Sequence, residues 1–357
     1  MDKVPFVAAL AVTREALTNK GVLMQMGLKT LLTAAVVTAG LITSAFAADK
    51  KYTIGYDNYF MGNSWSVQLA AEFKAEAEKD KDRVNVVYVE SAGDTQKQIT
   101  NIEDLITKKV DAIITTPTSP TALIPTLKKA RAAGIKVVLL ASTIKSQDYD
   151  ALVTVDDIAF GKAGAEWLVK QMGGKGNIIA LNGIAGISVS DDRYKGAKEV
   201  FDANPGIKIL GAVDASWDYA QGKQAVSNLL AANPQIDGVW SQGGAMTLGA
   251  IDAFEAAQRP LVPMTGEDNN GYLKRWQALK DKGFVSIATS KPTWLASEAL
   301  RITLDLLDGK SATRDTVLPV PTITADDLGK YMKADLSDSF WANTRLTDEQ
   351  VKAIFAN

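Results

Sequence analysis

LNGIAGISVSDDRYKG, residues 181–196 of this 357-residue chain, decides the fold class. An apolar run over 178–181 enters this stretch as a predicted strand, and a predicted helix leaves it. Its serines can cap that helix, and Asp191, Asp192 and Arg193 fall in the first turn. A strand that turns through a glycine-containing loop into a helix is the unit of open α/β sheets, which bind ligands at this edge. The glycines lack G-x-G-x-x-G spacing, so we assign no dinucleotide site.

The same alternation of short apolar runs and longer amphipathic runs extends in both directions. Strands are predicted over residues 52–58, 84–90, 110–115, 136–141, 151–155, 177–181, 207–213, 238–241, 261–265, 284–289 and, in extended form, 317–324. Helices are predicted over residues 65–79, 95–108, 120–133, 158–172, 189–203, 219–232, 246–257, 271–282, 293–307 and 347–355. Two series of similar length predict an α/β fold of two similar doubly wound lobes with parallel sheets, joined by a multi-segment hinge.

Composition excludes several kinds of chemistry. The chain has no cysteine and no histidine, so disulfides, thiol chemistry, histidine general-base chemistry and histidine metal sites are excluded. A net charge of −2 without a long basic run argues against a nucleic-acid partner. The absence of cysteine also suits an oxidising compartment. We expect no catalytic residue, no metal site and no cofactor.

The beginning of the chain has the pattern of a targeting segment. A short cationic start, MGLK, precedes an apolar run rich in small residues, and the run ends in the A-x-A cleavage form at residues 45–47. We interpret residues 1–47 as an over-long start plus a signal peptide, with Met24 or Met26 as the initiator. The mature chain is then expected to begin near Ala48, after secretion.

Polar and aromatic side chains gather where the predicted strands end. The carboxyl ends of parallel strands lie at one edge of a sheet, so these side chains are expected to face a common cleft. Amide, carboxylate and guanidinium groups pair with vicinal hydroxyls, and aromatic rings cover C–H faces, which together favour a small polyhydroxylated ligand. The candidate ligand-binding residues are Asn63, Trp65, Ser142, Arg193, Trp217, Gln242, Asp268, Asn269 and Asn270.

Structural roles stay open for some of these residues. Arg193 could pair only with Asp191 or Asp192, which is the usual role of a surface arginine. The run Asp268-Asn269-Asn270 could only form the turn before a glycine. The remaining large indoles considered are expected to pack rather than to contact a ligand, namely Trp240, Trp276, Trp294 and Trp341.

These motifs, taken together, resemble the bacterial periplasmic sugar-binding proteins of the ribose-binding (type I) family over roughly residues 52–324. The matching residues are Asn63 and Trp65 at the first helix, Arg193 in a G-I-A-G-x-S-x-x-x-x-R segment, Trp217 in Ser216-Trp217-Asp218, and Asp268 in Gly266-Glu267-Asp268. The resemblance implies the type I periplasmic binding protein fold. It also implies a periplasmic, monomeric solute-binding protein that captures a sugar or polyol by hinge closure and delivers it to the membrane permease of an ABC importer.

The resemblance further implies where the lobes begin and end. An N-terminal lobe of residues 48–155 and 291–320, a C-terminal lobe of 156–290 and 321–340, and a tail helix in 341–357 follow from it. The helix after Pro292 is accordingly expected to cross back to the first lobe.

Three departures from the ribose-type pattern bear on the ligand. Ala141-Ser142 stands in place of an Asp-Arg pair, Gly243 in place of a ligand-binding asparagine, and Ser290 in place of a hinge glutamine. We therefore expect a ligand other than ribose in the ribose pose, such as a larger or deoxy sugar, a branched sugar or a polyol. A non-sugar ligand such as a quorum signal, and presentation to a chemoreceptor, stay open. An enzyme is disfavoured because no acid–base motif stands out, and a repressor because a signal segment occupies the place of a helix-turn-helix.

Overall fold

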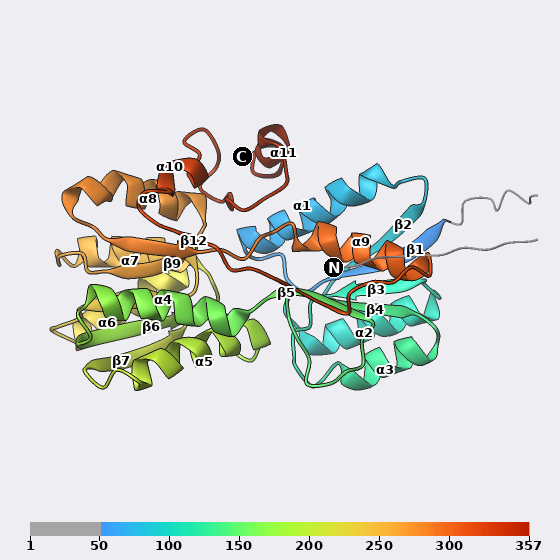
Figure 1. Cartoon of the computed structure of the whole chain (residues 1–357), viewed down its shortest axis with the longest axis horizontal. Coiled ribbons are helices and arrows are strands. Elements are labelled where there is room, and N and C mark those ends of the chain that lie inside the picture. The colour runs from blue at the N-terminus through green and yellow to red at the C-terminus, as the bar shows by residue number, and fades with distance from the viewer. Residues whose placement is uncertain (1–50, 357) are drawn as a thin grey trace, which may run out of the picture. The chain divides into compact units, whose positions relative to one another are not determined.

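The computed structural model describes residues 51–356, in which strands and helices alternate around two six-stranded sheets (Figure 1). The strand order is β11-β5-β4-β3-β1-β2 in the first sheet and β12-β10-β9-β8-β6-β7 in the second. Neighbouring strands are parallel throughout the described residues except for the pair β10 and β12, which is antiparallel. The predicted α/β fold of two similar doubly wound parallel-sheet lobes is confirmed.

The first lobe is built on the first sheet, with helices on both faces. Its strands are β1 (Tyr52–Asn58), β2 (Val84–Glu90), β3 (Ala112–Thr115), β4 (Lys136–Leu140), β5 (Ala151–Val155) and β11 (Asp315–Leu318). Buried apolar side chains of α1 (Ser64–Lys79) and α9 (Leu295–Leu307) form one core with the sheet. Those of α2 (Thr95–Thr107) and α3 (Ile124–Ala132) form the core on the other face. Burial on both faces explains why β3 and β4 read as continuous apolar runs.

The second lobe repeats this plan. Its strands are β6 (Gly176–Asn182), β7 (Ile207–Asp214), β8 (Gly238–Ser241), β9 (Met264–Glu267), β10 (Ser286–Thr289) and β12 (Thr322–Ile323). One face is covered by α4 (Asp157–Gln171) and α5 (Ser188–Asp202), and the other by α6 (Tyr219–Ala232), α7 (Gly244–Ala256) and α8 (Asn270–Leu279). A short 3-10 turn, η1 (Lys280–Lys282), follows α8.

The chain passes between the two sheets at three places: from β5 to α4, from β10 to α9, and from β11 to β12. The helix α9 follows the last long strand of the second sheet but packs on the first, as expected for the helix after Pro292. Three connections of this kind are what a hinge between two lobes requires.

Several elements differ from the sequence-based expectation, including β9, which was predicted over 261–265 and begins at Met264. The extended run 317–324 is interrupted by two prolines and contributes β11 and β12 to different sheets. The helix predicted over 120–133 begins only at Ile124, after a turn. A short helix α10 (Leu328–Tyr331) was not predicted, whereas α11 (Asp348–Ile354) has the expected capping box of Thr347 and Gln350. The predicted signal segment 1–47 and the mature start at Ala48 lie outside the described residues.

Two glycines allow α4 and α5 to approach within backbone contact. A Cβ atom on Gly161 would lie 1.8 Å from the carbonyl oxygen of Arg193, and a Cβ on Gly196 would lie 2.1 Å from that of Ile158. Only glycine fits at such distances, because backbone atoms cannot rotate away as a side chain can. This contact fixes the first turns of both helices against one another, and it thereby places Arg193 beside Asp157.

Candidate functional site

A small buried cavity lies where strand ends of both sheets meet the helices that follow them. Its free volume of about 40 Å³ exceeds the ~10–15 Å³ that one buried water requires, so it has room for more than one water. The side chains come from the loops after β1, β3, β4, β6, β7, β9 and β10 and from the C-terminal segment, in agreement with the strand-end rule. The lining residues are Tyr59, Asn63, Trp65, Thr116, Ala141, Ile187, Val189, Arg193, Trp217, Glu267, Lys291 and Trp341.

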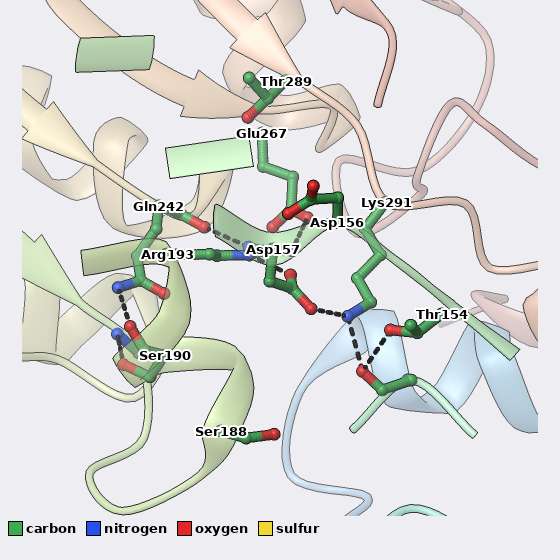
Figure 2. Close-up of polar contacts among 12 residues, drawn as sticks. Thr154, Asp156, Asp157, Ser188, Ser190, Arg193, Gln242, Glu267, Thr289 and Lys291 are labelled. Atoms are coloured by element: carbon green, nitrogen blue, oxygen red, sulfur yellow. Dashed lines mark hydrogen bonds and ion pairs between the residues drawn. The ribbon is translucent and has the colours of Figure 1, made fainter. Parts of the chain in front are cut away.

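Arg193 lies at the wall of this cavity with its guanidinium group already bonded (Figure 2). It is 2% exposed, and its Nε donates to Asp157 Oδ1 at 2.9 Å. One terminal nitrogen donates to the Gln242 carbonyl at 2.9 Å and the other to Glu267 Oε1 at 3.1 Å. The guanidinium carbon also lies 3.5 Å from the ring centre of Phe160. The alternative pairing with Asp191 or Asp192 is wrong, because the second turn of α5 points Arg193 inward to partners on α4 and β9.

Lys291 extends the same chain of charges toward the first lobe. This lysine follows β10 at the second crossing, is 3% exposed, and donates to Asp157 Oδ2 at 2.7 Å. Its Nζ also donates to the carbonyl oxygen of Ala141, at the end of β4, at 2.7 Å. Burial lowers the pKa of Lys291 and raises that of Glu267. The two cations, Arg193 and Lys291, thus face two carboxyl groups, those of Asp157 and Glu267, and the wall carries balanced charge.

Four aromatic side chains complete the cavity. The Trp65 indole donates to the Lys291 carbonyl at 3.0 Å, and the Trp341 indole donates to Ser64 Oγ at 2.9 Å. The Tyr59 hydroxyl accepts a bond from Ser66 Oγ at 3.1 Å. These bonds fix three of the four rings, so their faces are preorganised as apolar surfaces.

The position of the fourth ring, that of Trp217, depends on two glycines of the stretch 181–196. Both Ser216 and Trp217 have a φ of +53°, which turns the loop after β7 back toward β6. A Cβ on Gly183 would lie 2.1 Å from atoms of the Trp217 indole. Gly183 therefore leaves the space that the ring fills, while Gly186, with a φ of +80°, allows the turn into α5.

The structure brings four of the nine predicted binding residues to the cavity: Asn63, Trp65, Arg193 and Trp217. Asn63 has a second role, since its Oδ1 accepts from Ser66 N at 2.8 Å and caps α1. Ser142 lies beside the cavity and bridges the lobes, with its Oγ 3.0 Å from Ser188 Oγ.

Gln242 is buried behind the wall. Its amide Nε2 donates to Asn182 Oδ1 at 3.3 Å and to the Ser190 carbonyl at 3.2 Å, which holds the loop between β6 and α5.

The acidic-amide run 268–270 is not among the lining residues and mainly holds the C-terminal segment. Asp268 Oδ2 accepts from Asn343 N at 2.8 Å and from Ser290 Oγ at 2.9 Å. Asn269 caps α8 and pairs with Trp341 in a β-bridge. The Asn270 amide donates to three carbonyl groups of the C-terminal segment, those of Lys333, Leu336 and Ser337.

Three buried polar atoms around this site have no hydrogen-bond partner among residues 51–356. They are the donor Trp217 Nε1 and the acceptors Gln242 Oε1 and Asp268 Oδ1. All three belong to predicted binding residues. Burial, reinforced by the neighbouring Glu267 carboxylate, raises the pKa of Asp268 to about 7. An unpaired buried polar atom costs free energy. Of these three residues only Trp217 lines the cavity, so its Nε1 is the candidate contact for a bound molecule.

Sequence reasoning missed several residues of the site. Glu267 and Lys291 adjoin positions that were singled out, Asp268 and Ser290, so the strand-end rule could have included them. Asp157 follows a predicted crossing between the lobes, and no motif in the sequence pointed to it. Trp341 was expected to pack, and it lies instead in the cavity wall, because the tail that carries it returns to the cleft. No sequence pattern indicates that return.

Two features are absent from the described residues. Within residues 51–356, we find no cluster of three or more acidic side chains placed to hold a metal ion. Nor is any helix in that range long and apolar enough to span a membrane.

Comparison with known proteins places the chain among relatives. Residues 54–311 match a family described as "Periplasmic binding protein domain". The chain is 31% identical over 248 residues to a xylitol-binding protein of Mycolicibacterium smegmatis, an alignment covering 69% of this chain and 70% of that protein. It is 25% identical to the ribose import binding protein RbsB of Bacillus subtilis, covering 76% and 87%. A crystal structure of an ABC transporter solute-binding protein from Thermobispora bispora superposes with a TM-score of 0.75 at 28% identity, covering 86% and 96%.

Proposed function

Because this chain belongs to the periplasmic binding protein domain family, we propose that it captures one small neutral sugar or polyol in the cavity between its lobes. The family consists of solute-binding proteins, and the relatives described above include proteins named for xylitol and ribose. The site of this chain supplies its own argument for the chemical class of the ligand, which rests on charge and on an unpaired polar atom.

The charges at the wall favour a neutral ligand. Arg193 and Lys291 are each bonded to carboxylates inside the protein, and their positive charge is matched by Asp157 and Glu267. An anionic ligand such as a sugar phosphate would have to displace one of these buried pairs, which costs several kcal/mol. A hydroxyl group has no such requirement, so the balanced wall favours a polyhydroxylated neutral molecule.

The unpaired indole of the cavity wall carries the proposal. Trp217 lines the cavity, and its Nε1 is a buried donor without a partner in the described chain. A hydroxyl oxygen of a ligand can accept from this indole N–H. The indole faces of Trp65 and Trp217 can cover the C–H surfaces between those hydroxyls.

Closure of the lobes follows from the same arrangement. We propose that residues 48–155 with 291–320 move against residues 156–290 with 321–340 about the three crossings. The ligand favours the closed form because Asn63 and Trp65 contact it from one lobe and Arg193 and Trp217 from the other. We further propose that a monomer, cleaved near Ala48 in the periplasm, presents this closed form to the permease of an ABC importer.

A thermal-shift titration tests the binding. The purified protein is screened against xylitol, ribitol, D-ribose, D-xylose, L-arabinose and D-galactose, with ribose 5-phosphate as the anionic comparison. A ligand at 100 times its Kd stabilises the native state by about 2.7 kcal/mol, so the melting temperature should rise with concentration. A neutral hit without a response to ribose 5-phosphate supports the proposal.

Two outcomes contradict the proposal: no shift with any neutral member of the panel at millimolar concentration, or chemical turnover of a hit. Trp217→Ala should abolish the shift. Trp167→Ala, which removes a partly buried indole from α4 away from the cavity, should leave it in place.

A further inference from the structure

The C-terminal segment crosses between the lobes a fourth time. Its first part belongs to the second lobe: Leu328 lies in the core of that lobe, and Asn270 N donates to the Phe340 carbonyl at 2.7 Å. Its last part belongs to the first lobe, where Leu346 and Val351 pack against α1. In Figure 1 the red C-terminal segment accordingly runs from α10 beside α8 to α11 beside α1.

The crossing itself is held from both sides. Toward the second lobe, Ala342 N donates to the Asp268 carbonyl at 3.0 Å, and Asn343 N donates to the Asp268 carboxylate at 2.8 Å. Toward the first lobe, Trp341 N donates to Gln68 Oε1 at 2.9 Å, and Gln68 Nε2 returns a bond to the Trp341 carbonyl at 2.9 Å. We call residues 341–343 the strap.

A buried carboxylate anchors the strap where it reaches the first lobe. Glu72 of α1 is 1% exposed, and its Oε1 accepts from Arg345 N at 2.9 Å and from the Thr344 hydroxyl. The Trp294 indole at the start of α9 donates to Asn343 Oδ1 at 3.0 Å. These bonds resist displacement of the segment, because breaking those to Glu72 leaves its buried carboxylate with fewer hydrogen bonds.

The strap also reaches the cavity. Trp341 is 3% exposed, lines the cavity, and is fixed to α1 by its indole bond to Ser64. The neighbouring Asp268 carboxylate bonds the strap with one oxygen, while its other oxygen is buried and unpaired. The element that connects the lobes here is therefore in direct contact with the space for the ligand, unlike a remote tether.

We propose that the strap is a fourth, ligand-proximal connection in which Trp341 closes the cavity over the ligand and the bonds on both sides limit the opening of the lobes. The proposal rests on the proposed function for the ligand's class, but the restraint on opening does not need a ligand. To open the cleft, the chain must break the strap's bonds to Gln68, together with the bonds of Thr344 and Arg345 to Glu72, or the strap's bonds to Asp268. A ligand that contacts Trp341 strengthens the closed arrangement.

The experiment measures opening and binding separately. Because the chain has no cysteine, spin labels can be placed at Thr100→Cys on α2 and Gln224→Cys on α6, both exposed. Distances between the labels are measured by pulsed electron resonance without ligand in the parent, in Trp341→Ala, in Gln68→Ala and in the control Trp167→Ala. Gln68→Ala removes the two bonds between α1 and the strap backbone while leaving the Trp341 indole and its bond to Ser64 in place. Binding of xylitol and of D-ribose is measured by calorimetry in the same proteins.

We expect both strap variants to broaden the distance distribution, whereas Trp167→Ala keeps that of the parent. Trp341→Ala should also weaken the binding of whichever probe the parent binds by about tenfold or more, the usual loss for a buried indole contact. Unchanged distances in both strap variants overturn the restraint, even if the parent binds neither probe and the proposed function fails. Changed distances with unchanged probe affinity in Trp341→Ala overturn the role of Trp341 as a wall of the site.

Discussion

Each lobe buries a carboxyl group near the end of a strand, yet the two groups are treated differently. In the first lobe, Asp57 of β1 accepts from Ser91 Oγ at 2.8 Å through one oxygen. Its other oxygen accepts from Gln98 Nε2 at 2.6 Å and from Thr115 Oγ1 at 2.7 Å. Both oxygens of Asp57 are thus occupied by its own lobe.

In the second lobe, Asp268 uses only one oxygen. Its Oδ2 accepts from Ser290 Oγ and from Asn343 N, and its Oδ1 is buried without a partner in the described chain. Burial raises the pKa of Asp57 to about 6 and that of Asp268 to about 7. Asp268 has the higher pKa of the two because nothing in the described chain bonds its Oδ1, so less of the cost of burying its charge is offset.

The largest effect is expected from breaking the buried charge network of the cavity wall, which consists of Asp157, Arg193, Glu267 and Lys291. Arg193→Ala removes the cation between Asp157 and Glu267 and leaves buried carboxylates with Lys291 alone. Breaking a buried pair in this way costs about 3–5 kcal/mol. Urea unfolding should therefore show a strong loss of stability, and sugar binding should be lost with it.

The matched control lies in the first lobe. Arg131 pairs with Asp150 at 3.2 Å but is 37% exposed, so Arg131→Ala should cost no more than about 1 kcal/mol. Equal effects of the two substitutions would contradict the view that Arg193 holds a buried charge network together, whereas Arg131 makes only a surface pair.

The next prediction concerns pH. In the folded chain the pKa of Asp268 is about 7, above its ordinary value of 3.8, so the native state binds the extra proton. The stability contributed by that proton is present in acid and is lost as the pH rises through about 7. Asp268→Asn keeps an acceptor for Ser290 and Asn343 and cannot titrate. Relative to this variant, the wild type should lose on the order of 2–4 kcal/mol between pH 4 and pH 8, at 1.36 kcal/mol per pKa unit.

Urea unfolding of both proteins at several pH values measures this difference, in which the groups common to both largely cancel. A difference in unfolding free energy that stays constant from pH 4 to pH 8 would refute the assignment.

The fold and part of the candidate site could be predicted from the sequence. The fold followed from local patterns: apolar runs marked the strands, and the loop at 181–196 marked a strand-to-helix unit. The same rule placed Asn63, Trp65, Arg193 and Trp217 at the cavity. These predictions succeeded because the strand ends of a parallel sheet must share one edge, whatever the details of packing.

The partners of those side chains could not be predicted. Whether Arg193 meets Asp191 or Asp157 depends on the backbone contact between α4 and α5, which is a property of tertiary packing. The return of the tail, which carries Trp341 into the cavity and occupies Asp268, depends on contacts between residues far apart in the sequence. Residue types at strand ends therefore indicate where a site lies but not which of its groups are left free for a ligand.

The smallest effect is expected from a change at the backbone contact between α4 and α5, which places Arg193 beside Asp157. Gly196→Ala introduces a Cβ 2.1 Å from the Ile158 carbonyl oxygen, and the two helices must separate to admit it. Overpacking of this kind costs about 1–3 kcal/mol. It should also weaken ligand binding, since Arg193 and Asp157 lie on the helices that move apart.

Gly329→Ala in α10 is the control, because nothing lies within 4 Å of its Cβ and its backbone is not in the left-handed region. That substitution should leave stability unchanged or raise it by about 0.4–1 kcal/mol. Thermal unfolding of the two variants decides the matter: if Gly196→Ala is as stable as Gly329→Ala, the α4–α5 contact does not position the charged wall of the second lobe.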